Sequence, residues 1–107
     1  MTTVQVRRDE KGVCGLRVKG HADYAEAGSD IVCAAASILI TTCVNALETV
    51  AGILPLVQQD EESAMIMVSL PGGLPPEKEH DARIILKTTL QGFRDIAAEY
   101  SRNLKVI

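Results

Sequence analysis

Aromatic residues are scarce in this chain of 107 residues, which has no tryptophan, two tyrosines and one phenylalanine. Hydrophobic residues nevertheless make up 47% of the sequence, so the core must be built from alanine, valine, isoleucine and leucine. Side chains of this size favour helices packed on a sheet. The length suits one domain over residues 1–107, large enough to bury a core without disulfide bonds.

Runs of basic residues are also missing, and eleven basic residues against fourteen acidic ones give a net charge of −3. Proteins that bind nucleic acids directly use basic patches, often with aromatic side chains on which bases stack. We therefore expect no direct binding to nucleic acid. A basic protein or peptide would suit the acidic balance better as a partner.

Cysteines are few and odd in number: Cys14, Cys33 and Cys43. They lack paired spacing, and the start of the chain has no apolar segment typical of a secretory signal. A reduced, cytoplasmic protein is therefore expected. The CxxC and HxxxH spacings of zinc sites are absent from the sequence as well, so we expect neither a metal nor another cofactor.

Charge is absent from Ile31 to Leu47, a run of seventeen residues near the short limit for a membrane span. The run nevertheless contains Ser37, Thr41 and Asn45, and it is rich in alanine. Segments this short and this polar more often pack inside proteins. We therefore expect a core helix and no membrane partner.

Alternating hydrophobicity predicts two β-hairpins. The first runs from Thr2 to the end of a second strand, with its turn at Asp9–Gly12 and with Cys14, Leu16 and Val18 on its inward face. The second hairpin turns at the acidic residues 60–62.

Helical spacing predicts two helices. The first is capped by Ser29 or Asp30 and runs to about Val50. The second runs from Glu77 to about Arg102, with its apolar face at Ile84, Ile85, Thr88, Phe93, Ile96, Ala97 and Tyr100. A final edge strand over residues 104–107 completes the order ββαββαβ. This order predicts an α+β fold, with two helices packed on a mostly antiparallel sheet.

The stretch "GHADYAEAGSDIVCAAAS", residues 20–37, places a histidine and a cysteine at the ends of predicted elements. Cys33 lies in the first turn of the first helix, where unpaired amides and the helix dipole stabilise a thiolate. His21, just after the second strand, could take the thiol proton and later protonate a leaving amine. Two plainer alternatives stay open at this point: a small buried Cys33 and a surface His21.

Two polar neighbours have alternative roles. Asp30 either orients His21, as the third member of a catalytic triad does, or only caps the helix. Ser37 lies one turn after Cys33, and its hydroxyl either bonds within the site or returns to a carbonyl of the preceding turn.

The loop between the histidine and the helix has little to anchor it except Tyr24. The segment Ala22–Gly28 is therefore predicted to be a lid that orders over an extended peptide and brings His21 to Cys33. The backbone amides at the helix start, that of Cys33 among them, are candidates for binding the oxyanion.

This stretch resembles the signature of the ribosomal-processing cysteine protease family, Prp. The matching residues are Gly20, His21, Ala22, Ala25, Gly28, Asp30, Ile31, Val32, Cys33, Ala34 and Ser37. The resemblance implies a catalytic dyad of Cys33 as nucleophile and His21 as base. It also implies a substrate loop that includes Gly20, Ala22, Tyr24 and Gly28.

The same resemblance implies the substrate and the assembly. Members of the family remove a short N-terminal extension from the bacterial large-subunit ribosomal protein numbered twenty-seven, and they are usually homodimers. We therefore expect a cysteine endopeptidase whose partner is that extension. Two alternatives are a non-catalytic, ribosome-associated module that holds a peptide in the same groove, and a thiol redox sensor.

Overall fold

The computed structural model describes all residues except Ala27. Seven elements follow in the predicted order: β1 (Thr2–Asp9), β2 (Gly12–Lys19), α1 (Ile31–Thr49), β3 (Leu56–Asp60), β4 (Met65–Ser69), α2 (Pro76–Glu99) and β5 (Leu104–Val106). The prediction of an α+β fold with the order ββαββαβ is therefore confirmed.

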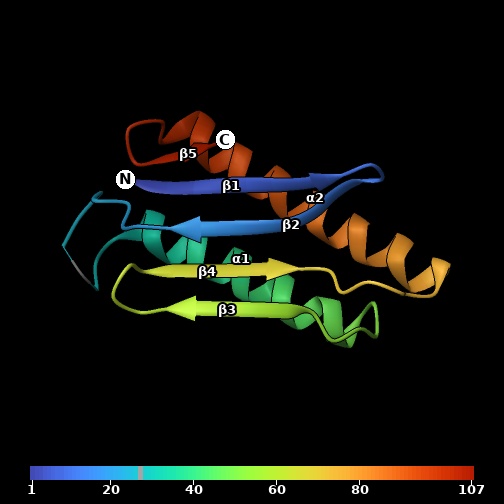
Figure 1. The fold of residues 1–107 in the computed structure, drawn as a ribbon. Coiled ribbons are helices and arrows are strands. Elements are labelled where there is room, and N and C mark those ends of the chain that lie inside the picture. Colours follow the sequence, from blue (N-terminus) through green and yellow to red (C-terminus); the bar gives the residue numbers. More distant parts are fainter. Residues whose placement is uncertain (27) are drawn as a thin grey trace.

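The five strands form one sheet in the order β3-β4-β2-β1-β5. All neighbours pair antiparallel except β5, which lies parallel to β1 because α2 carries the chain back along the sheet. Both helices cover the same face of this sheet, and no helix of the described residues lies on the other face (Figure 1). The core lies between the two layers, and the loop after β2 lies at one end of the sheet (Figure 1).

A β-bulge in β2 changes which residues of the first hairpin face the core. Arg7 pairs with Gly15, but the next residue, Arg8, pairs with Val13, so Cys14 is the extra residue of β2. Val13 therefore takes the core position, and Cys14 is half-buried outside the core. The predicted inward orientation of Cys14 was wrong, because a bulge reverses the alternation on one side of itself.

Gly15 next to this bulge leads to a prediction about stability. The variant Gly15→Ala is expected to lower the free energy of unfolding by about 2 kcal/mol, as overpacking typically does. A Cβ atom there would lie 2.7 Å from the Val68 carbonyl oxygen and 3.2 Å from the Ser69 Cβ. Urea unfolding of Gly15→Ala and of the control Gly72→Ala measures this effect, since a Cβ on Gly72 meets nothing within 4 Å. Equal stability of the two variants would contradict the prediction.

Helix α1 begins after Asp30 and packs its buried stripe on the sheet and on α2. Its length and apolarity would allow it to cross a membrane, but in this structure the stripe lies in the core. Burial raises the pKa of the Cys43 thiol within the stripe, which makes that thiol a poor nucleophile. The buried residues of α1 are Val32, Ala36, Ile40, Cys43 and Leu47.

Helix α2 ends earlier than predicted, and its buried face differs. Ile84 is 48% exposed and Thr88 is also exposed, so these two predicted core positions were wrong. The helix contacts both the sheet and α1. This packing shifts the buried face of α2 by about one residue from the predicted face. The main chain then turns at Tyr100, whose carbonyl accepts from the amides of Asn103 and Leu104. The buried residues of α2 are Ala82, Leu86, Thr89, Leu90 and Phe93.

Candidate active site

Two adjacent cavities share His21, Cys33 and Ser37 in their walls. The first has a volume of about 430 Å³ and lies between α1 and the β3–β4 hairpin. The second, of about 570 Å³, lies between the start of α1 and the loop that precedes it. A peptide therefore has room on both sides of the Cys33 thiol.

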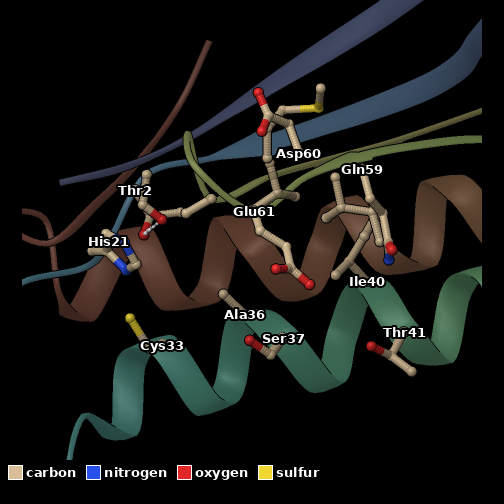
Figure 2. A pocket seen from close by; sticks show the side chains of 15 residues that line it. Thr2, His21, Cys33, Ala36, Ser37, Ile40, Thr41, Gln59, Asp60 and Glu61 are labelled. Atoms are coloured by element: carbon tan, nitrogen blue, oxygen red, sulfur yellow. Dashed lines mark hydrogen bonds between the residues drawn. The ribbon is translucent and has the colours of Figure 1, made fainter. Parts of the chain in front are cut away.

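Cys33 is the third residue of α1, and its half-buried side chain packs against the core. Its sulfur accepts a hydrogen bond from the backbone amide of Ala22, with 3.3 Å between N and Sγ. Figure 2 shows the thiol directed into the first cavity, toward the ring of His21. The predicted position in the first helical turn is confirmed.

Asp30 is the N-cap of α1 and also holds the preceding loop. One carboxylate oxygen accepts from the amides of Val32 and Cys33, at 3.0 and 2.9 Å. The other accepts from the amides of Tyr24 and Ala25, at 2.9 and 3.3 Å. The bond from the Cys33 amide is the largest cause that lowers the pKa of Asp30, and the two loop amides add to it. In the described part of the chain, no hydrogen bond links Asp30 to His21.

His21 is exposed and lies at the rim of both cavities, just after β2. Gly20 before it has a φ of +96°, and a Cβ there would lie 2.6 Å from the Met1 carbonyl oxygen. Only glycine fits this close approach, so Gly20 fixes the direction in which the chain leaves the sheet. Among the described residues the His21 ring and the Cys33 thiol face each other without a hydrogen bond (Figure 2).

The first half of the loop is anchored more firmly than the sequence suggested. Ala22 is fully buried, and its carbonyl accepts from the Asn103 side-chain amide at 3.0 Å. The N-terminal ammonium group pairs with Asp23 at 3.0 Å. The ring of Tyr24 packs edge-on against that of Tyr100, with 5.4 Å between centroids.

The second half of the predicted lid contains Gly28, whose φ is +88° and whose surroundings are open. Ala27 lies outside the described residues. The expectation that Tyr24 is the main anchor was wrong, because residues distant in sequence hold Ala22 and Asp23 as well.

Three amides at the helix start already donate hydrogen bonds. Those of Val32 and Cys33 donate to the Asp30 carboxylate, and that of Ala34 donates to the Asp30 carbonyl at 3.0 Å. The expectation that the Cys33 amide is available for an oxyanion was therefore wrong in this structure. A strong carboxylate cap competes for the same donors.

Comparison with known proteins identifies the family. Residues 1–105 match the sequence model of the family described as "Cysteine protease Prp". The chain is 31% identical over 107 residues to the ribosomal processing cysteine protease Prp of Bacillus subtilis, covering 99% of this chain and 96% of that protein. The chain belongs to the Prp family of cysteine proteases.

Solved Prp structures share the fold along the whole chain. Prp from S. aureus with a covalently linked product peptide has a TM-score of 0.87 and 30% identity, covering 99% of this chain and 97% of that one. The same enzyme with a substrate peptide has a TM-score of 0.82 and 29% identity, covering 100% and 98%. As a Prp protein, the chain is a cysteine protease that processes ribosomal proteins.

Ser37 lies one turn after Cys33 in this Prp protein, as predicted, and lines both cavities. It is exposed, and in the described part of the chain its hydroxyl has no hydrogen-bond partner. The hydroxyl therefore does not return to the preceding turn in this structure. Its position leaves it accessible to a peptide in the groove (Figure 2).

Sequence reasoning missed three further residues, two that line the first cavity and one that contacts Ala22. Asp60 and Glu61, which were interpreted only as a hairpin turn, line the first cavity, and Glu61 extends toward α1 near Ser37 (Figure 2). Asn103 was missed as well, because it lies 81 residues from Ala22 in the sequence. No local pattern marks such a contact; only the packing of the C-terminal turn against the loop reveals it.

Proposed function

We propose that this Prp protein is a cysteine endopeptidase that removes the N-terminal extension from the precursor of the large-subunit ribosomal protein numbered twenty-seven. The observation that carries the proposal is the Cys33 thiol facing His21 between two peptide-sized cavities. The peptide complexes of the S. aureus relative support it, because one contains a substrate peptide and another a covalently linked product.

The chemistry begins with the transfer of the Cys33 thiol proton to His21. The thiolate attacks the scissile carbonyl carbon, so that an S–C bond forms and the carbonyl oxygen becomes an oxyanion. The C–N bond then breaks as the His21 imidazolium gives its proton to the leaving amine. A thioester remains on Cys33.

Water completes the reaction. His21, now neutral, takes a proton from a water molecule, which attacks the thioester carbon. The S–C bond breaks, a carboxylic acid leaves, and Cys33 regains its proton. Both steps need the His21 ring and the Cys33 sulfur in contact, so we infer that a bound peptide draws them together.

The groove suits an extended segment of a basic protein. Asp60 and Glu61 give the first cavity a negative wall, and the whole chain carries a net charge of −3. Ribosomal proteins are rich in lysine and arginine, so this field favours their approach. The family resemblance adds an expected preference for a hydrophobic stretch that ends in aromatic residues before the scissile bond.

We further propose a cytoplasmic homodimer. Helix α1 exposes apolar side chains without any charge between them, with Ile31 55% exposed and Ile38 63% exposed. Two such faces could meet without bringing like charges together.

The proposal predicts a single cut in a peptide that spans the extension and the first mature residues of the precursor. Mass spectrometry of the incubated peptide measures the cut, and a peptide with the same composition in scrambled order is the control. Cleavage of the first peptide alone supports the proposal. Binding of the intact peptide by the folded, reduced protein would instead favour a non-catalytic module.

A further inference from the structure

We propose that Asn103 is a positioning residue of the active site, which holds Ala22 so that the Ala22 amide stabilises the Cys33 thiolate. The inference rests on the proposed function, since it concerns the same nucleophile. It begins from two hydrogen bonds in series. The Asn103 Nδ2 donates to the Ala22 carbonyl at 3.0 Å, and the Ala22 amide donates to the Cys33 sulfur at 3.3 Å.

The two bonds fix the peptide groups on either side of the Ala22 Cα. One group carries the amide that points at the sulfur, and the other carries the carbonyl that Asn103 holds. The Ala22 side chain is fully buried, which limits rotation at this residue further. The first of these two peptide groups joins His21 to Ala22, so the same contacts hold the backbone of His21.

Asn103 is itself well placed to act as a fixed point. Its backbone amide donates to the Tyr100 carbonyl at 2.9 Å, at the end of α2. Its carbonyl accepts from the amide of Thr2 at 2.9 Å, at the start of β1. The turn between α2 and β5 lies at the same end of the sheet as the loop after β2 (Figure 1). The Asn103 side chain therefore joins the loop to both layers of the fold.

The Ala22 amide matters because other donors near the sulfur are occupied. The amides of Val32 and Cys33 donate to the Asp30 carboxylate, which is a stronger acceptor than a thiol. In the described part of the chain, the Ala22 amide is the backbone donor whose hydrogen bond reaches Cys33 Sγ. A hydrogen bond donated to a charged group favours its charged form, so this donor is placed to stabilise negative charge on the Cys33 sulfur during the reaction.

An asparagine side chain fits this role by its donor group. Its amide nitrogen donates to a carbonyl, whereas the carboxylate of an aspartate of the same shape only accepts. Asn103→Asp would therefore place a carboxylate against the Ala22 carbonyl and push the loop away. Asn103→Ser removes the amide without adding charge.

The test measures the rate at which iodoacetamide alkylates Cys33 as a function of pH, resolved by peptide mass spectrometry. We expect both variants to need a higher pH than wild type for the same rate, with a drop of roughly tenfold near pH 7 for Asn103→Asp. Cys14 in the same samples is an internal reference. Gln5→Glu makes the same amide-to-acid change at an exposed position of β1, and this matched control should behave as wild type.

The outcomes separate this inference from the proposed function. An unshifted Cys33 profile in folded Asn103→Ser, with thermal unfolding as the check on folding, would overturn the inference. The alkylation assay uses no substrate, so failure of wild type to cleave the precursor peptide would overturn only the proposed function. Where wild type does cleave, Asn103→Ser should lower kcat with little change in KM, because Asn103 lines neither cavity. A rise in KM at constant kcat would contradict the inference.

Discussion

Replacing Cys33 by alanine is expected to lower peptide cleavage by at least about 10⁴-fold, because the residual protein lacks the nucleophile. The fold should persist, since the side chain is small, half-buried and near the end of a helix. Cys33→Ser should be almost as inactive, because a hydroxyl without a strong base is a weak nucleophile. The precursor peptide and mass spectrometry provide the measurement.

His21→Ala is a second test of the dyad, and Cys14→Ala is the control. His21→Ala should reduce cleavage by about 10² to 10⁴-fold, the range that positioned acid–base groups contribute. Cys14→Ala should keep wild-type activity, because Cys14 lies on the bulge of β2 and lines neither cavity at the site. Cleavage that survives in Cys33→Ala but is lost in Cys14→Ala would reject the proposed dyad.

Asp30 is the position where one substitution should damage both activity and stability. Asp30→Ala removes the acceptor for two helix amides and two loop amides. We expect the melting temperature to fall by roughly 5 °C, as loss of a helix cap in a domain of this size implies. Cleavage should fall by about 100-fold or more, because both Cys33 and the loop lose their support.

Asparagine at the same position separates the two roles of Asp30. Its single carbonyl oxygen can still accept from the amides of Val32 and Cys33, as N-cap asparagines do. Its NH₂ group would then face the amides of Tyr24 and Ala25, placing donors against donors. Asp30→Asn should therefore lose activity with a smaller loss of stability than Asp30→Ala. Asp95→Asn, at an exposed position of α2, is the control.

The pH dependence of stability gives an independent check on Asp30. Hydrogen bonds from the backbone lower the pKa of its carboxyl below the usual 3.8. Its contribution is therefore complete above that value and is lost as the pH falls through the lower folded-state pKa. Thermal unfolding should show a large difference between wild type and Asp30→Ala at pH 7, and a shrinking one below about pH 4. A difference that stays constant into acid would contradict this account.

The sequence by itself determined the order of elements and the position of Cys33 in the first turn of α1. Alternation in the strands, helical spacing and the cap at Asp30 depend on neighbours within a few residues, and such local patterns can be interpreted without a structure. The same holds for the signature that contains His21 and Cys33. Element bounds were close, because the cap and the Gly-rich and Pro-rich turns limit the elements locally.

Only the tertiary structure decided which groups surround the thiol. The bulge that displaces Cys14 depends on pairing with β1, and the buried face of α2 depends on its packing against two partners. The contact of Asn103 with Ala22 joins two chain segments that meet only after folding. These contacts carry no local sequence signal, because their energy comes from proximity in space between residues far apart in the chain.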